Sequence, residues 1–194
     1  MSGAQEQLSF AQTRALMRSD FERLVGWYGG GSLPQRVFWY FQPNYQALFF
    51  YRLYRWLFVK GWKNSARLLF LYSLYATGVE ISPTTSIGAA CLLEHAFGII
   101  LCGRIGARCS FAGQCGTGGG IGEGDIGGGP GLPVVGDDVR FGPKALVLGP
   151  IRIGSRVAIG ASAIVTVEVP DDSEVLPLPS KIIRVKMGRA ESAP

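Results

Sequence analysis

Apolar residues recur at every sixth position through most of the second half of this 194-residue chain. A strict period of six matches neither the 3.6-residue turn of an α-helix nor the two-residue alternation of a half-buried strand. It predicts one short strand and one turn per repeat, three repeats to each triangular coil, and a parallel β-helix with the repeating side chains stacked inside. The repeating residues, called anchors below, are Ile81, Ile87, Leu93, Ile99, Ile105, Phe111 and Thr117, and then Val135, Phe141, Val147, Ile153, Ile159 and Val165.

A second inward position follows four residues after each anchor, and it holds small or aliphatic side chains in nearly every repeat. Cys91, Cys109 and Cys115 occupy it, and Phe97 falls on it as well. Buried free thiols are expected at these positions, because a small apolar side chain is needed there. Cys102 lies off this position and is expected to be more exposed.

The repeat is interrupted at residues 118–133, which read GGGIGEGDIGGGPGLP. Nine glycines among sixteen residues are too many for well-packed coils, and long irregular segments on rigid scaffolds often carry function. We therefore predict a loop ejected from the β-helix; the alternative is one poorly formed coil. The segment contains a GxGxxG match at 122–127, but no strand precedes it and no helix follows, so it does not predict a dinucleotide site.

The first part of the chain has a different composition. Aromatic residues crowd there, and every charged residue from Arg23 to Val79 is basic. These charges also interrupt every apolar stretch, so no membrane-spanning helix is expected. We divide the chain into a helical region, a β-helix domain and a tail, with bounds 1–77, 78–183 and 184–194.

Local signals within the helical region predict separate helices. Residues 44–59 and 64–75 are predicted as two helices, and the second stops at Gly78, a usual position for a C-terminal glycine. Asp20 is expected to cap or open a short helix, which the GGGS sequence at 29–32 then breaks. The fold class is therefore mainly β, with an N-terminal α-helical region.

The chain is basic, with 19 Lys and Arg against 14 Asp and Glu and a net charge of +5. This balance suits a phosphorylated cofactor, anionic lipid or nucleic acid, although a mildly basic soluble protein has it too. Net charge alone does not predict a nucleic-acid partner. The basic, aromatic residues 36–75 are expected to pack against a neighbouring domain or subunit; the alternative is peripheral contact with an anionic membrane face. The polar N-terminus has no signal peptide, so a cytoplasmic location is expected, with peripheral contact at the inner membrane face.

Catalytic chemistry is suggested by the single histidine. His95 falls two residues after Leu93, where a side chain should project from a coil. Glu80, fifteen residues earlier, is close to one coil away and could orient the imidazole and raise its basicity; Glu94 is the other nearby carboxylate. An isolated histidine is also an ordinary surface or core residue in many proteins. One histidine and four cysteines without a CxxC motif predict no metal site.

Two segments resemble a known family. GVEISPTTSIGAACLLEHAFGIILCGRIG, which begins at Gly78, looks like the serine acetyltransferase branch of the hexapeptide acyltransferases: it has a G-[IV]-[DE]-I-x-P start, six-residue rungs and an acid–His pair. The closing PLPSKII is similar to the V-P-A-[KR]-I-[IV] ending of that family. The resemblance covers residues 78–183 and implies a left-handed parallel β-helix that uses acetyl-CoA as a co-substrate, with no metal.

The resemblance also implies roles for individual residues. His95 matches the catalytic base, Glu80 the carboxylate that orients it, and Glu94 an acidic residue that helps to hold the acceptor. In such proteins acetyl-CoA lies in a groove between the β-helices of a homotrimer. Residues expected to lie near it are Gly118, Gly142 and Ala161 along the pantetheine, and Lys181 and Arg184 near the phosphates, although a solvated basic tail is an equal alternative for the last two.

One departure from the family bears on the acceptor. Its serine enzymes carry Arg-His-Pro after the glycines, where the arginine binds the serine carboxylate, and this chain has Gly131-Leu132-Pro133. We therefore predict an acetyl-CoA-dependent O-acetyltransferase whose acceptor is a sugar or polysaccharide intermediate. The alternatives are a serine O-acetyltransferase of cysteine biosynthesis and a non-catalytic β-helix scaffold.

Overall fold

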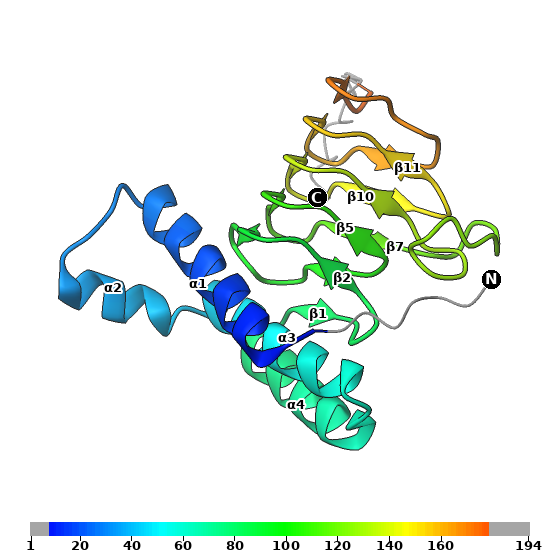
Figure 1. Ribbon diagram of the computed structural model, residues 1–194. Coiled ribbons are helices and arrows are strands. Elements are labelled where there is room, and N and C mark those ends of the chain that lie inside the picture. The colour runs from blue at the N-terminus through cyan, green and yellow to red at the C-terminus, as the bar shows by residue number, and fades with distance from the viewer. Residues whose placement is uncertain (1–7, 179–194) are drawn as a thin grey trace, which may run out of the picture.

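The computed structural model describes residues 8–178, in which four helices precede a stack of short parallel strands (Figure 1). The helices are α1 (Phe10–Trp27), α2 (Leu33–Tyr40), α3 (Pro43–Val59) and α4 (Lys63–Thr77). The strands form three sheets, one on each face of the coil, and every strand pair is parallel. The fold is the predicted left-handed parallel β-helix with an N-terminal helical region.

Successive strands fall on successive faces, so neighbours within a sheet come from successive coils. The first sheet, sheet A, has the order β1-β4-β7-β10-β13, with β1 (Glu80–Ile81), β4 (Ile100–Leu101), β7 (Gly116–Gly118), β10 (Leu146–Leu148) and β13 (Ile164–Val165). Sheet B has the order β2-β5-β8-β11, with β2 (Ser86–Ile87), β5 (Arg104–Ile105), β8 (Val134–Val135) and β11 (Arg152–Ile153). Sheet C has the order β3-β6-β9-β12-β14, with β3 (Leu92–Leu93), β6 (Ser110–Phe111), β9 (Arg140–Phe141), β12 (Ala158–Ile159) and β14 (Glu174–Val175).

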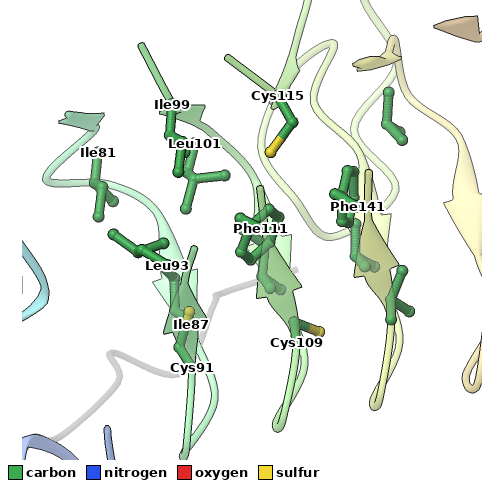
Figure 2. Packing of buried hydrophobic residues seen from close by; sticks show 14 of the residues in the cluster. Ile81, Ile87, Cys91, Leu93, Ile99, Leu101, Cys109, Phe111, Cys115 and Phe141 are labelled. Carbon is green, nitrogen blue, oxygen red and sulfur yellow. The ribbon is translucent and has the colours of Figure 1, made fainter. Parts of the chain in front are cut away.

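The anchors fill the interior of the coil as predicted. All thirteen are buried, and Phe111 and Phe141 stack in successive coils with ring centroids 4.6 Å apart. Figure 2 shows these side chains converging, with the thiols of Cys91, Cys109 and Cys115 among them. These three cysteines are free and buried and Cys102 is half-buried, which confirms the expectation for the thiols.

The register of one coil differs from a strict period of six. Ile81 pairs with Leu101 rather than with Ile99, and Leu101 pairs with Thr117. The strand anchor of this coil is therefore Leu101, although Ile99 is buried as well. The expectation that Phe97 points inward is wrong, since its side chain is 76% exposed.

The spacing around this coil shows how the irregularity is absorbed. Anchors on sheets B and C stay 18 residues apart, as in the pairs Ile87–Ile105 and Leu93–Phe111. From Leu93 to Leu101 the chain takes eight residues, and from Leu101 to Ile105 it takes four. One turn is thus two residues longer than the repeat and the next is two shorter.

The helices begin and end where local chemistry allows. α1 starts with a capping box between Ser9 and Gln12, which satisfies backbone N–H groups of the first turn. α3 and α4 span the two predicted helices with one to two extra residues at their ends. α4 ends at Gly78, whose φ of +69° is the left-handed conformation that a terminal glycine adopts at little cost.

A buried ion pair joins the helices to the β-helix. Asp20 lies in the middle of α1 and does not cap a helix, which corrects the expectation from its sequence context. Its carboxylate accepts two hydrogen bonds from Arg52, at 2.9 and 3.2 Å, and a third from the Cys91 backbone. Arg52 also donates to the carbonyls of Ile87 and Gly88, so α1, α3 and the first coil share one polar network.

Two tyrosines extend this junction along α3. The Tyr51 hydroxyl donates to the Thr85 carbonyl at 2.9 Å, and the Tyr54 hydroxyl donates to the Ile81 carbonyl at 2.6 Å. Both side chains are 1% exposed, and burial raises the pKa of Tyr51 to about 12. Helix α3 therefore closes the open N-terminal end of the β-helix core, where carbonyls would otherwise be buried without a donor.

We predict that Arg52→Met lowers the free energy of unfolding by about 3–5 kcal/mol, because it leaves the Asp20 carboxylate buried without its cation. Denaturant unfolding followed by circular dichroism measures the change. Arg36→Met is the matched control, because Arg36 pairs with Glu22 at the surface, where an ion pair contributes about 0–1 kcal/mol. Equal losses in the two variants would show that the buried pair is not a structural link.

Candidate functional site

His95 lies in the longer turn, which joins β3 on sheet C to β4 on sheet A. The two extra residues move this turn away from the regular coil, and the His95 side chain is exposed. His95 has a φ of +54°, a left-handed conformation that is uncommon for a residue with a side chain. The same conformation occurs at Gln114, Lys144 and Ser162, the equivalent turn residues of later coils, so it belongs to the regular turn of the β-helix.

The turns of later coils stack on the His95 turn and form a continuous column. Gln114 N–H donates to the Phe97 carbonyl, and Lys144 N–H donates to the Gly113 carbonyl one coil further on. Space at the base of the column is tight, because a Cβ on Gly113 would lie 2.7 Å from the His95 carbonyl oxygen. Glycine at position 113 therefore allows the second coil to support the His95 backbone directly.

A cavity of about 530 Å³ opens beside His95, between its turn and the helices. Its walls include Tyr28 after α1, Asn44 of α3, Tyr75 of α4 and Phe97. Among the described side chains that line it, the only ionisable groups are the His95 imidazole and the hydroxyls of Tyr28 and Tyr75. The cavity can therefore hold a group of moderate size through aromatic contacts and amide hydrogen bonds rather than through ion pairs.

The two predicted carboxylates lie near this turn but do not contact the imidazole. Among residues 8–178 no hydrogen bond or ion pair joins His95 to Glu80 or Glu94. Glu80 is exposed at the start of β1, and its backbone N–H donates to the Ile99 carbonyl, at the end of the His95 turn. Burial raises the pKa of the Cys102 thiol, and the nearby charge of Glu80 adds to this increase.

Glu94 is half-buried and immediately precedes His95, and its backbone N–H donates to the Phe111 carbonyl at 2.7 Å. The negative charge of its carboxylate lies close enough to the core to disfavour ionisation of the Cys115 thiol. Burial raises the pKa of Cys115 to about 12, and the charge of Glu94 contributes to this increase.

The residues predicted to lie near acetyl-CoA fall at two corners of the coil. Gly142 and Ala161 belong to the His95 column, and a Cβ on Gly142 would lie 2.7 Å from the Ala161 nitrogen. Gly118 is on the other side of sheet A, where β7 ends and the glycine-rich segment starts. Lys181 and Arg184 lie outside the described residues.

The glycine-rich segment leaves the coil between β7 and β8 and projects beyond the strands (Figure 1). Asp125 organises its tip, since the carboxylate accepts hydrogen bonds from the N–H groups of Gly127 and Gly129. Arg152 of β11 donates to the Ile126 carbonyl at 2.9 Å and holds the tip against sheet B. No charged side chain is present at Gly131-Leu132-Pro133, where the chain returns to the coil.

The cavity residues Tyr28, Asn44, Tyr75 and Phe97 were not predicted as site residues. Aromatic positions in a helix indicate burial or a surface face, and their spacing says nothing about a histidine far away in the chain. The one local signal was Gly78, because the turn that it forms directs the end of α4 toward the His95 turn. Phe97 lies against this glycine, with its ring about 3 Å from the position of a Cβ there.

These features define a hexapeptide-repeat protein of the left-handed β-helix class, with an exposed histidine on a corner of its first full coil. No protein-family model matches the chain. It is 34% identical to the serine acetyltransferase of Mycobacterium tuberculosis over 154 residues, 78% of this chain and 64% of that protein. It is also 34% identical to the serine acetyltransferase of Synechococcus elongatus over 143 residues, 73% of this chain and 57% of that protein.

Solved structures show the same relationship. A serine acetyltransferase isoform from Entamoeba histolytica, in complex with cysteine, superposes with a TM-score of 0.75 at 27% identity, covering 91% of this chain and 63% of that one. The Neisseria gonorrhoeae serine acetyltransferase, in complex with serine, has the same score and identity, covering 89% and 69%. This chain therefore shares the fold of the serine acetyltransferases and about a third of the residues aligned with them, which confirms the resemblance of its motifs. It spans about three fifths of the length of the curated relatives it matches.

We predict that Gly113→Ala lowers the free energy of unfolding by about 1–3 kcal/mol, because the added methyl group must displace the His95 backbone. Gly124→Ala is the control, since nothing lies within 4 Å of a Cβ there, and its expected change is below about 0.5 kcal/mol. Denaturant unfolding of both variants provides the comparison. An unchanged stability of Gly113→Ala would contradict the close packing of the two turns.

Proposed function

We propose that this chain is an O-acetyltransferase that moves an acetyl group from acetyl-CoA to a hydroxyl, with His95 as the general base. The observation that carries this proposal is the position of His95, exposed on the longer turn beside a cavity of about 530 Å³. The imidazole takes the proton of the acceptor hydroxyl as its oxygen attacks the thioester carbonyl. The carbon–sulfur bond then breaks, and the CoA sulfur leaves with the proton that His95 held.

The carboxylates have supporting roles in this proposal. Glu80 orients His95, which its backbone position beside the end of the His95 turn supports. Glu94 helps to hold the acceptor, which its position next to His95 supports. Acetyl-CoA follows the column of turns past Gly142 and Ala161, because these residues stack on the same corner as His95. Roles for Gly118, Lys181 and Arg184 stay predictions from the resemblance.

L-Serine is the first candidate acceptor. The relatives at 30–34% identity are named as serine acetyltransferases, and one solved relative was crystallised with serine. Their names do not support the sugar or polysaccharide acceptor predicted from the loop. A glutamate beside the base would suit the amino group of serine, since opposite charges attract.

A second candidate is an acceptor hydroxyl on an uncharged ring, such as a sugar. Two observations favour it: the cavity beside His95 is lined by Tyr28, Tyr75 and Phe97, and none of its lining residues within 8–178 is a cation that could bind a carboxylate. Gly131-Leu132-Pro133, where the glycine-rich segment rejoins the coil, contains no cation either. Without a cation, binding of serine would lose the free energy of one charged hydrogen bond to its carboxylate, about 1.5–3 kcal/mol.

We also propose a homotrimer in the cytoplasm, where acetyl-CoA is available. The outward positions of sheet A support the trimer, because they form an apolar row across four neighbouring strands. In the strand pairing this row consists of Ile100, Gly116, Leu146 and Ile164. Ile164 is 64% exposed. The outward positions of sheet C are more polar, with Ser110, Arg140 and Glu174. An exposed apolar stripe is typical of a surface that a subunit covers.

We predict that His95→Asn lowers the rate of CoA release by about 10²–10⁴-fold, because the general base is lost. Asparagine tolerates the left-handed conformation, so the turn should keep its shape. Asp138→Asn is the matched control, since Asp138 is exposed with a similar φ of +58° on another corner of the coil and should keep the wild-type rate. The measurement is thiol release from acetyl-CoA with L-serine and, separately, with simple sugars and polysaccharide fragments.

The same assay separates the alternatives. Release with L-serine and none with sugars supports the first candidate, and the opposite result supports the second. Full activity of His95→Asn would assign the base elsewhere. If wild-type protein neither binds acetyl-CoA in calorimetry nor releases CoA with any acceptor, the non-catalytic scaffold is correct.

For the trimer, Ile164→Glu is expected to reduce the molecular mass in analytical ultracentrifugation from that of a trimer toward that of a monomer. The charge would be buried in the subunit interface without a partner. Ala158→Glu places the same charge on the outward side of β12 in sheet C and should leave the mass unchanged. A monomeric wild-type protein would rule out the proposed trimer.

A further inference from the structure

The outer face of α4 carries exposed apolar and basic side chains, and we propose that it docks onto the surface of an anionic lipid bilayer. This α4 face consists of Lys63, Arg67, Leu68, Leu71, Tyr72 and Tyr75. Each of these residues lies three or four positions from another member of the set, so they lie along one side of the helix. The proposal stands independently of acetyl transfer, because the residues that its test exchanges lie outside the cavity beside His95.

The α4 face has no partner within the described part of the chain. α4 packs on α3, and α3 in turn packs on the β-helix, so α4 is the outer layer of this end of the molecule (Figure 1). Ala66, Ser73 and Thr77 point toward the protein and are buried. On the opposite side Leu68 is 70% exposed and Tyr75 is 86% exposed. Exposed apolar side chains gathered on one helix indicate an interaction surface rather than ordinary solvent exposure.

The charge at this end indicates what the surface binds. Residues 23–79 contain seven Arg and Lys residues and no Asp or Glu, and two of the seven, Arg36 and Arg52, pair with Glu22 and Asp20 of α1. Lys60, Lys63 and Arg67 form no ion pair within residues 8–178. A second copy of the same face would place these cations against one another, which is unfavourable. An anionic surface instead attracts them over the range of a Debye length.

The side chains also match the chemistry of a bilayer interface. Trp and Tyr are enriched at the level of lipid headgroups, and leucines on the same face reach the acyl boundary. Trp62, at the start of α4, is 62% exposed and extends the aromatic part of the face. No helix within the described residues is long and apolar enough to cross a membrane. The contact we propose is therefore peripheral, with α4 lying in the plane of the interface.

The α4 face runs up to the candidate active site. Tyr75, its last residue, lines the cavity beside His95 together with the exposed Phe97. Docking of α4 would therefore bring the opening of this cavity close to the lipid surface. An acceptor that is itself held at the bilayer would then reach His95 without leaving the surface.

The test is co-sedimentation of the full chain with vesicles at low salt. Wild-type protein should sediment with phosphatidylcholine–phosphatidylglycerol vesicles, and not with phosphatidylcholine alone. The variant Lys63→Glu/Arg67→Glu should bind at least about tenfold more weakly, because two attractions become repulsions. Leu68→Gln/Leu71→Gln should also weaken binding while keeping good helix formers in the exposed positions.

The control is Arg104→Glu/Arg140→Glu, which changes the net charge by the same amount on exposed strand positions of the β-helix. It should keep most of the wild-type binding. Failure of wild-type protein to sediment with anionic vesicles, or equal losses in the charge variant and the control, would overturn the proposal. A lower molecular mass of Leu68→Gln/Leu71→Gln in solution would identify a second copy as the occupant and overturn it as well. CoA release with a water-soluble acceptor, measured on the same variants, should stay unchanged, so loss of docking is separable from loss of catalysis.

Discussion

The structure depends on one constraint: the strands of each coil must lie in register beside those of the preceding coil. In the coil that carries His95, parallel strand pairing keeps the anchors of sheets B and C 18 residues apart, as in Ile87–Ile105 and Leu93–Phe111, so that their buried side chains stack. Two residues added to the His95 turn are therefore compensated at once in the next turn, where Gly103 takes a φ of +96°. This compensation lets one turn project from the coil without disturbing the core. The exposed position of the histidine and the space beside it depend on that exchange.

The helices complete the site because they are fixed to the same coil. Asp20, Arg52, Tyr51 and Tyr54 bind carbonyls and amides of the first strands and turns, so α3 cannot shift without breaking buried hydrogen bonds. Its position places α4 alongside, and Gly78 then leads the chain from α4 into β1. The cavity beside His95 is the space left between this rigid arrangement and the longer turn. Its neutral, aromatic walls come from helices, whereas the base comes from the β-helix.

Most of the fold could be predicted because a period of six is a strong and local signal. The departures arose where the signal was ambiguous. Ile99 and Leu101 are both apolar and both buried, so the sequence could not show which one pairs with Ile81. Aspartate is a common residue type at helix caps, and only the distant partner Arg52 explains why Asp20 is buried in the middle of α1. The cavity residues could not be predicted, because most of them belong to the helical region and only the packing of helices against the β-helix brings them near the His95 turn.

By itself, the sequence determined the coil, its buried contents, the free thiols and the family resemblance, because each of these depends on residues at fixed short spacings. Tertiary structure alone decided which turn is long, which carboxylate pairs with Arg52 and which aromatic side chains surround His95. The physical reason is the range of the interactions. Strand anchors and helix caps act between neighbours or across one coil, whereas an ion pair or a cavity wall joins residues that only packing brings together. The glycine-rich segment shows both effects: its composition predicts turns, but its position against sheet B depends on Arg152.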